Sequence, residues 1–307
     1  MTDLETRFVG SMAGSALGDA IGELAFRIPD EARLRKQIDA TGELVYTDDT
    51  AMAIGLAQSL LARRQIDPQH LGDTFRSNYQ REPWRGYASG PPSLFRLVER
   101  QGITYVEAAQ GLFGGQGSYG NGAAMRIAPL GLYCHAAPDL YDQARASAAV
   151  THAHPVGIDG AAVQARAVAQ AVELDPDERF DPQAFLKGLR DMARTPEMQA
   201  KLAQVSELLA GGVPGRQAAR ELGQGVAVHR SLPFALYAFL RHPRSLEDCL
   251  FCAILNGGDR DTLGAMACAV SGAYLGAEAI PTGWWQRLEN RELITGLARR
   301  LAAAAGN

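Results

Sequence analysis

The sequence predicts an all-α protein in which many helices form a single domain. Apolar residues recur at spacings of three and four along most of the chain, whereas few stretches alternate polar and apolar residues as strands do. Several helical segments are rich in Gly and Ala and almost free of charge, which predicts close packing between helices. The 307 residues suffice for one large domain. We therefore expect an orthogonal multi-helix bundle that spans residues 1–307.

The first half of the chain contains a helix with an unusual stripe of glycines. Glycine recurs at every fourth residue from Gly10 to Gly22, and Asp19 and Glu23 lie near the C-terminal end of this helix. Because glycine destabilises helices, the stripe predicts close approach of another helix. We expect a loop with a short helix at residues 28–42 and a second loop at residues 83–92. Further helices are predicted at 51–62, 68–79, 93–101, 105–112 and 123–133, the last broken at Pro129.

In the second half of the chain, the sequence predicts a charged, proline-containing loop at residues 175–181 with helices on both sides of it. The segment 263–277 contains no charged residue, so we expect a helix that is buried on most faces. The helices predicted in this half are 159–174, 182–193, 196–209, 216–222, 231–240, 246–255, 263–277, and one or two helices within 284–305.

Two of the charge-free helices begin with acidic residues and threonine. These residues are Thr47, Asp48 and Asp49 before one helix, and Asp259, Asp261 and Thr262 before the other. Capping explains either set, because Asp and Thr are good N-caps and acids favour the positive end of the helix dipole. A calcium loop of the EF-hand type does not fit the second set, because Val270 stands where the bidentate Glu is required. If the two sets meet, their four carboxylates require cations, and oxygen ligands favour Mg, Mn or Ca.

A glycine-rich loop and two histidines form the other candidate binding segments. Residues 114–122 read GGQGSYGNG, and such a loop lets backbone N–H groups approach a phosphate. A flexible surface loop is the alternative. No Lys-Ser/Thr pair follows and no strand precedes, which excludes a Walker loop and a Rossmann turn. His152 and His154 precede a buried helix, where a buried structural histidine is the usual interpretation and a ligand contact the alternative.

Charge and cysteine content restrict the class of protein. The net charge of −4 gives no general attraction to nucleic acid or anionic membranes, so we expect neither as a partner. Cys249 and Cys252 form a CxxC without a second pair, which predicts buried thiols in an apolar helix. No signal peptide is visible, and the apolar run 9–21 is too short and glycine-rich for a membrane span. We expect a cytoplasmic monomer.

Seven segments, taken in order, form a set that can be compared with known families. The segments are GSMAGSALGDAIGE, YTDDTAMAIGLAQSLL, RGYASG, GQGSYGNGAAMRIA, THAHPVGIDGA, ELGQGVAVHRSLPFALYAFLR and NGGDRDTLGAMACAVSGAYLG. The set resembles the ADP-ribosylglycohydrolase family, which includes dinitrogenase reductase-activating glycohydrolase, and is most similar to the branch that acts on serine-linked and polymeric ADP-ribose. The segments span nearly the whole chain, and the ordered set is specific. The resemblance implies an all-α fold with a central binuclear site for two Mg²⁺ or Mn²⁺ ions.

The resemblance also implies a role for each candidate residue. The implied metal ligands are Thr47, Asp48, Asp49, Asp259, Asp261 and Thr262. The loop implied to hold the diphosphate and ribose contains Gly117, Ser118, Tyr119, Gly120 and Asn121. The other implied substrate contacts are His152 at the diphosphate, Gly90 at the ribose, and Phe113 with Tyr119 around the adenine.

Two positions depart from the family pattern. The serine-directed branch has an essential Glu seven residues after the position of Asp19, but this chain has Phe26 there. We expect Glu23 to perform the proton transfer, with Asp261 as the alternative. Arg260 stands where the family usually has a small polar residue.

The resemblance implies a hydrolase that cleaves the O-glycosidic bond of ADP-ribose in ADP-ribosyl-serine, poly(ADP-ribose) or O-acetyl-ADP-ribose. Its expected partner is an ADP-ribose-containing small molecule or an ADP-ribosylated protein. One alternative is hydrolysis of the N-glycosidic bond of ADP-ribosyl-arginine. A second alternative is a non-catalytic ADP-ribose-binding module, because the essential Glu is displaced. A third is an unrelated helical scaffold whose acidic residues are only caps.

Overall fold

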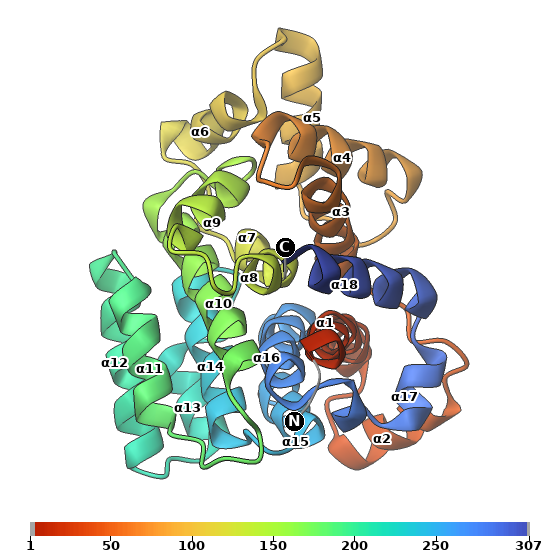
Figure 1. Ribbon diagram of the computed structural model, residues 1–307, viewed down its shortest axis with the longest axis vertical. Coiled ribbons are helices and arrows are strands. Elements are labelled where there is room, and N and C mark those ends of the chain that lie inside the picture. Colours follow the sequence, from red (N-terminus) through yellow and green to blue (C-terminus); the bar gives the residue numbers. More distant parts are fainter. Residues whose placement is uncertain (1–3, 306–307) are drawn as a thin grey trace.

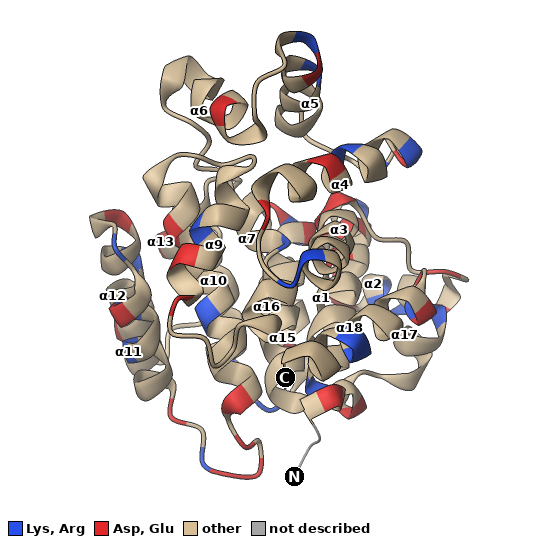
Figure 2. Cartoon of the chain, turned by 45° about the horizontal axis from the view of Figure 1, so that its top comes forward, with Lys and Arg blue, Asp and Glu red and all other residues tan. Residues whose placement is uncertain are grey.

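The computed structural model describes residues 4–305, and its regular structure is helical (Figure 1). Among these residues no β-strand forms, and the only strand-like pairs are two isolated bridges, Leu44–Leu288 and Gly120–Ala227. The prediction of an all-α multi-helix domain is therefore confirmed. No helix within 4–305 combines the length and the apolar character that a membrane crossing needs. Acidic and basic residues are interspersed along the outer helices in Figure 2.

Nine helices form the first half of the described chain. They are α1 (Leu4–Arg27), α2 (Glu31–Ala40), α3 (Asp48–Arg63), α4 (Pro68–Arg81), α5 (Gly90–Gln101), α6 (Tyr105–Gly115), α7 (Gly122–Met125), α8 (Ala128–Tyr133) and α9 (Leu140–Ala149).

Nine helices and two short 3-10 turns form the second half of the described chain. They are α10 (Pro155–Glu173), α11 (Pro182–Met192), α12 (Pro196–Ala210), α13 (Gly215–Leu222), η1 (Val228–Arg230), α14 (Leu232–Arg241), α15 (Leu246–Ile254), α16 (Arg260–Leu275), η2 (Ala277–Ala279), α17 (Thr282–Arg287) and α18 (Arg291–Ala305).

Some predicted boundaries are wrong, and proline explains two of the differences. The loop predicted at 83–92 ends earlier, because Pro91 and Pro92 occupy the first turn of α5, where a missing N–H group is tolerated. The helix predicted at 123–133 is two helices. Its break lies at Arg126 and Ile127, whereas Pro129 lies in the first turn of α8. Helix α9 was not predicted.

The long helices α1 and α16 pack against each other at the centre of the molecule (Figure 1). A Cβ atom built on Gly18 would lie 2.2 Å from the carbonyl oxygen of Gly264, and one on Gly272 would lie 2.0 Å from that of Gly10. The glycine stripe is thus the surface on which the two backbones touch, as predicted. The helices run antiparallel, since residues of higher number in α1 meet residues of lower number in α16.

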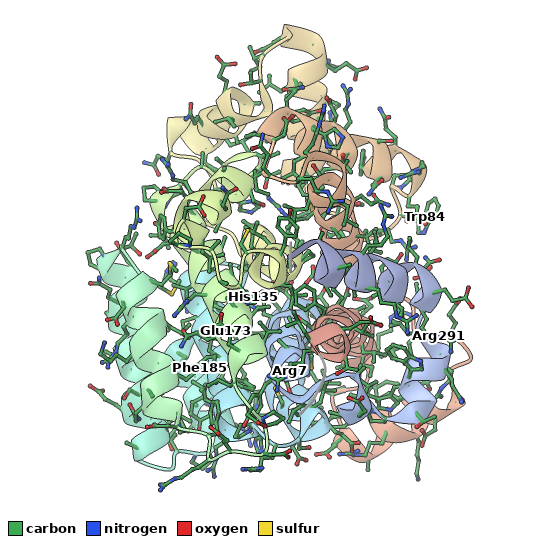
Figure 3. The ribbon with its side chains drawn as sticks, viewed as in Figure 1. Arg7, Trp84, His135, Glu173, Phe185 and Arg291 are labelled. Atoms are coloured by element: carbon green, nitrogen blue, oxygen red, sulfur yellow. The ribbon has the colours of Figure 1, made fainter. Side chains whose placement is uncertain are left out.

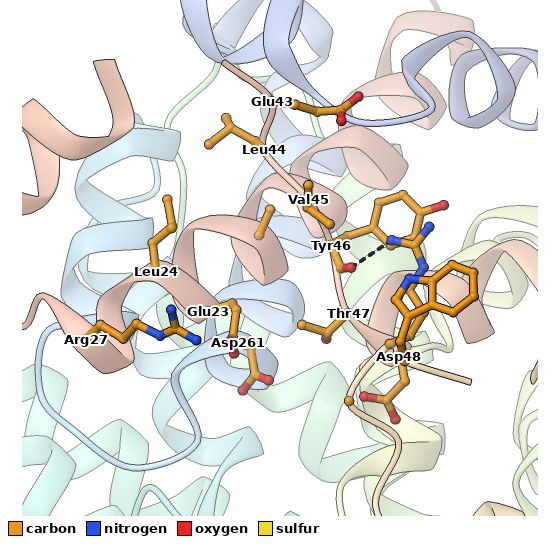
Figure 4. Close-up of a pocket in the computed structure, with 14 residues that line it drawn as sticks. Glu23, Leu24, Arg27, Glu43, Leu44, Val45, Tyr46, Thr47, Asp48 and Asp261 are labelled. Carbon is orange, nitrogen blue, oxygen red and sulfur yellow. Dashed lines mark hydrogen bonds between the residues drawn. The ribbon is translucent and has the colours of Figure 1, made fainter. Parts of the chain in front are cut away.

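Other helices surround this central pair. Helices α10, α14 and α15 pack against α16, and α18 packs against α1 and α3. Helices α4, α5 and α6 lie together at the top of the view in Figure 1, beyond α3. The antiparallel packing brings the C-terminal end of α1 to the N-terminal end of α16, which places Glu23 and Asp261 in one region (Figure 4).

The glycine contact makes a prediction about stability. We expect Gly18→Ala to destabilise the protein, because the new methyl group would meet backbone atoms of α16 that have no space to move. Overpacking of this kind costs about 1–3 kcal/mol, measurable by urea denaturation. Gly296→Ala is the matched control, because its Cβ would have no atom within 4 Å in α18, and it should stabilise the helix by up to about 1 kcal/mol. Equal stability of Gly18→Ala and the wild type would contradict this packing.

Candidate metal centre and adjoining cavities

The two acidic helix starts meet beside the central helix pair. A Cβ atom built on Gly22 of α1 would lie 2.6 Å from the Cα atom of Asp261, so α1 ends against the start of α16. The carboxylates of both sets line one cavity, which contains Asp48 and Asp49 of α3 together with Asp259 and Asp261. The two acidic sets therefore meet at one cavity, as the hypothesis of a shared metal site requires.

Asp19 of α1 fixes the start of α3 to the central helix pair. Its buried carboxylate accepts hydrogen bonds from the backbone N–H and hydroxyl groups of both Thr47 and Thr50, at 2.6–3.1 Å. The hydroxyl of Thr47 makes no capping hydrogen bond within its own helix. Asp19 thus caps α3 from a neighbouring helix, and the capping role does not fall to Asp48 or Asp49.

The acids at the two helix starts are buried close to one another. Burial, followed by the negative charge of Asp19, raises the pKa of both Asp48 and Asp49. Burial and then the charge of Asp259 raise the pKa of Asp261. The Oδ2 atom of Asp49 is buried and has no hydrogen-bond partner among the described residues. Both the burial and the mutual repulsion destabilise the charged carboxylates when no cation is present.

The donor set fits a hard divalent cation. Among residues 4–305, no three His, Cys, Asp or Glu side chains already surround one point in metal-ligand geometry, so the acids converge without forming a closed coordination shell. The buried Oδ2 atom of Asp49 lacks the hydrogen bond or counter-charge that a buried group needs among the described residues. Carboxylate and hydroxyl oxygens are the ligands that Mg²⁺ and Mn²⁺ prefer.

A cavity of about 340 Å³ extends from this acidic cluster, and we call it the loop cavity. Its wall includes most of the predicted site residues, namely Asp48, Asp49, Gly90, Phe113, Ser118, Gly120, Asn121, His152, Asp259, Asp261 and Thr262. A Cβ atom built on Gly90 would meet no atom within 4 Å, so this glycine leaves open space there. Gly117 and Tyr119 are not among the residues that line this cavity.

Gly117, Tyr119 and Phe113 hold different positions around the glycine-rich loop. Gly117 has a φ of +73°, and a Cβ atom there would lie 2.6 Å from the backbone nitrogen of His154, so its role in the fold is close packing. The ring of Tyr119 lies outside the loop cavity, edge-on to His154 with centroids 5.2 Å apart. Phe113 has a φ of +53° and is 68% exposed where it lines the cavity.

The segment 224–228 holds the glycine-rich loop, a contact that the sequence interpretation missed. The backbone N–H of Asn121 donates to the carbonyl oxygen of Val226 at 2.8 Å, and the backbone N–H of Val228 donates to the carbonyl oxygen of Tyr119 at 3.0 Å. The same segment joins the start of α16, because the N–H of Asp259 donates to the carbonyl of Gln224 at 2.8 Å. This backbone pairing fixes the loop relative to the acidic cluster, and no side-chain pattern reports it.

Asn121 links the glycine-rich loop directly to the acids. Its side-chain Nδ2 atom donates to Oδ2 of Asp259 at 2.7 Å. Asn121 is buried, as is Thr262, which lines the same cavity. The resemblance implied a substrate contact for Asn121, and the structure adds that this residue orients one of the candidate ligands.

His152 and Arg126 provide buried nitrogen atoms in the wall of the loop cavity. Burial and then the charge of Arg126 lower the pKa of His152 to about 3, so its imidazole is neutral at physiological pH. Nδ1 of His152 lies 2.7 Å from the hydroxyl of Thr151. Arg126 donates to the carbonyls of Gly122 and Ser147, and burial lowers its pKa to about 9, so it remains cationic.

Arg126 and Asp19 are the site residues that sequence reasoning did not assign. Each is the single charged residue in a long segment otherwise free of charge, residues 122–133 for Arg126 and residues 8–22 for Asp19. A lone charge in such a segment is a usable signal, because burial without a partner is unfavourable.

A second cavity of about 430 Å³ adjoins the loop cavity, and we call it the α1 cavity (Figure 4). The two cavities share Asp48, Gly86 and Asp261. Glu23 lines the α1 cavity, whereas Phe26 does not and is 46% exposed. The other lining residues come from the end of α1, the segment before α3 and the loop after α4, and they are Ala20, Leu24, Arg27, Glu43, Leu44, Val45, Tyr46, Thr47, Trp84 and Arg85.

Comparison with known proteins identifies the relatives of this chain. A family model described as ADP-ribosylglycohydrolase matches residues 1–307. The chain belongs to the ADP-ribosylglycohydrolase family. ADP-ribosylhydrolase ARH3 of Mus musculus is 35% identical, and the match covers 96% of this chain and 91% of the relative. ADP-ribosylhydrolase ARH3 of Homo sapiens is 34% identical, with 96% and 93% covered.

A solved structure supports the same conclusion for the fold of this chain. That structure is described as an ADP-ribosylglycohydrolase-related protein complex and is 28% identical to this chain, with a TM-score of 0.77. The match covers 99% of this chain and 100% of the other. The family resemblance inferred from the ordered motifs is therefore confirmed.

The acidic cluster makes a paired prediction about stability. In metal-free protein, Asp49→Asn should raise the free energy of unfolding by about 1 kcal/mol, because it removes one of several clustered charges and breaks no hydrogen bond of Oδ2. Asp19→Asn should instead lower it by about 2–4 kcal/mol, since it disrupts the hydrogen bonds to Thr47 and Thr50.

Thermal unfolding with and without Mg²⁺ separates these effects. The metal should stabilise the wild type, and Asp49→Asn should lose much of this stabilisation while it keeps its higher metal-free stability. If Asp49→Asn destabilised the metal-free protein as Asp19→Asn does, Asp49 would be a structural residue rather than a ligand.

Proposed function

We propose that the protein is a divalent-metal-dependent hydrolase that cleaves the O-glycosidic bond of ADP-ribose. The candidate substrates are ADP-ribosyl-serine, poly(ADP-ribose) and O-acetyl-ADP-ribose. One observation carries the proposal: two acidic helix starts from distant parts of the chain meet where the loop cavity and the α1 cavity join. Membership of the family and similarity to proteins named ADP-ribosylhydrolase support an ADP-ribosyl substrate.

The loop cavity provides groups suited to the ADP-ribose part of the substrate. Backbone N–H groups of the glycine-rich loop can approach a diphosphate, because the glycines carry no side chain. Neutral His152 can donate a hydrogen bond, and buried Arg126 adds a positive charge behind the same wall. The exposed ring of Phe113 offers a surface for stacking the adenine base. Together these contacts orient the reacting ribose towards the acids.

Six side chains at the helix starts would hold two Mg²⁺ or Mn²⁺ ions: Thr47, Asp48, Asp49, Asp259, Asp261 and Thr262. Such ions, when bound, neutralise the carboxylates and polarise ribose hydroxyls or water. The chain orients two of these ligands in advance, because Asn121 hydrogen-bonds to Asp259 and Asp19 hydrogen-bonds to Thr47. Hydrogen bonds of this kind hold ligands in place and support metal affinity.

Glu23 is the proposed proton-transfer residue. It lines the α1 cavity, and so does Asp261, which lies at the junction of the two cavities (Figure 4). Cleavage of a glycosidic bond passes through an oxocarbenium-like state, which nearby carboxylates stabilise. From the α1 cavity, the carboxyl group of Glu23 can exchange a proton with water or with the leaving oxygen. Asp261 is the second candidate because it lines both cavities.

The direct test of this function compares two peptides, one ADP-ribosylated on serine and one on arginine. The wild type should release ADP-ribose from the serine-linked peptide in Mg²⁺ or Mn²⁺, and chelation should abolish release. Asp259→Ala should lose both metal binding in calorimetry and turnover. Release from the arginine-linked peptide alone would indicate an N-glycosidic hydrolase. Binding of ADP-ribose without release from either peptide would indicate a non-catalytic binding module.

The role of Glu23 makes a separate prediction. Glu23→Gln should bind ADP-ribose with nearly unchanged affinity, whereas kcat should fall by about 10²–10⁴, the usual contribution of a general acid or base. Glu292→Gln on α18, an exposed carboxylate that lines neither cavity, is the control and should keep the wild-type rate. A wild-type rate in Glu23→Gln would assign proton transfer to another residue, with Asp261 the next to test.

A further inference from the structure

The α1 cavity contains charged and apolar groups that proton transfer at Glu23 does not use. We propose that this cavity binds the polypeptide part of the substrate and selects a basic side chain adjacent to the ADP-ribosylated residue. This inference rests on the proposed function and narrows its substrate class. The residues that would make the selection are Glu43 and Trp84.

The position of the cavity follows from that of the loop cavity. If ADP-ribose occupies the loop cavity with its reacting ribose at the acids, the group attached to that ribose must leave across the junction. The junction residues Asp48, Gly86 and Asp261 line both cavities, so the α1 cavity receives the attached group. Its volume of about 430 Å³ lies in the range of ligand-binding sites and exceeds what a serine side chain requires.

The charges of the α1 cavity favour a cationic ligand. The guanidinium of Arg85 is already paired with two carboxylates, because it hydrogen-bonds to Glu82 at 3.0 Å and to Glu289 at 2.6 Å. Glu23, Glu43 and Arg27 form no ion pair with the described residues. Apart from the junction acids Asp48 and Asp261, the cavity therefore has two carboxylates and one guanidinium that are not paired within residues 4–305. This imbalance attracts a positive side chain.

The exposed apolar surface of the cavity suits the stem of a basic side chain. Trp84 is 70% exposed and projects at the right-hand edge of Figure 3, and Val45 is 49% exposed. Exposed apolar groups gathered in one cavity are typical of a binding surface. A lysine or arginine of the attached polypeptide can pack its methylene stem against the indole ring, and Glu43 adds a negative charge to the same cavity.

The same charges disfavour a polymer as the leaving group. In poly(ADP-ribose) the departing part is itself a nucleotide diphosphate, which would bring negative charge close to Glu23 and Glu43. Only Arg27 is free to oppose that charge among the described cavity residues. The structure therefore favours an ADP-ribosylated polypeptide over the polymer as the substrate of this protein.

The test uses two ADP-ribosyl-serine peptides that differ at one position next to the modified serine, with Lys in one and Gln in the other. The wild type should show a kcat/KM about tenfold higher for the Lys peptide, the effect expected from one cation–π contact and one partly exposed ion pair. Glu43→Lys should reduce this ratio to about one or below, and Trp84→Ala should reduce it about threefold. Both residues are exposed, so thermal unfolding should report folded variants.

Glu207→Lys on α12 is the matched control, because it makes the same charge change at an exposed site on the opposite side of the molecule in Figure 1. It should keep the wild-type ratio. A wild-type ratio near one, an unchanged ratio in Glu43→Lys, or faster cleavage of poly(ADP-ribose) than of the Lys peptide would overturn the inference while the hydrolase function stands. Release from neither peptide, with no cleavage of poly(ADP-ribose) or O-acetyl-ADP-ribose either, would overturn the proposed function and this inference together.

Discussion

The antiparallel contact between α1 and α16 is the constraint on which the candidate site depends. Glycines on both helices let the backbones touch, with Gly18 against Gly264 and Gly10 against Gly272. Because the helices run in opposite directions, the end of α1 lies at the start of α16, and larger side chains in the stripe would force the pair apart. This contact brings Glu23 and Asp19 to the acids that begin α16, and Asp19 in turn holds the start of α3.

Buried aspartates that cap a neighbouring helix occur twice in this fold. Asp19 of α1 receives the donors of Thr47 and Thr50 at the start of α3. Asp159 of α10 receives the backbone N–H groups of Arg194 and Thr195 at the start of α12, together with the Thr195 hydroxyl. In both cases one carboxylate fixes the relative position of two helices. At α3 it also accepts from the N–H of Thr50, one of the first-turn donors that a helix cannot satisfy itself. At α3 this arrangement releases Asp48 and Asp49 for another role.

The two cavities differ in electrostatic character on either side of one acidic junction. The loop cavity has a neutral histidine and a buried arginine in its wall, which suits the negative charge of a diphosphate. The α1 cavity has an exposed tryptophan and carboxylates that form no ion pair within residues 4–305, which suits a basic polypeptide. A bond that joins a nucleotide to a protein would lie at the junction, where cations can neutralise the clustered acids. The separation of charge thus gives the substrate a direction across the site.

The sequence by itself determined most of the helices, the glycine contact, the two acidic sets and, through the ordered motifs, the family, whereas helix α9 and the break between α7 and α8 were not predicted. These features are local, since periodicity, glycine spacing and acids at helix starts are visible within one segment. Only the tertiary structure decided which groups meet: that Asp19 caps α3, that Asn121 contacts Asp259, that residues 224–228 hold the glycine-rich loop, and that Tyr119 lies outside the loop cavity. Contacts between residues far apart in the chain depend on how the helices pack, and no single segment records that packing.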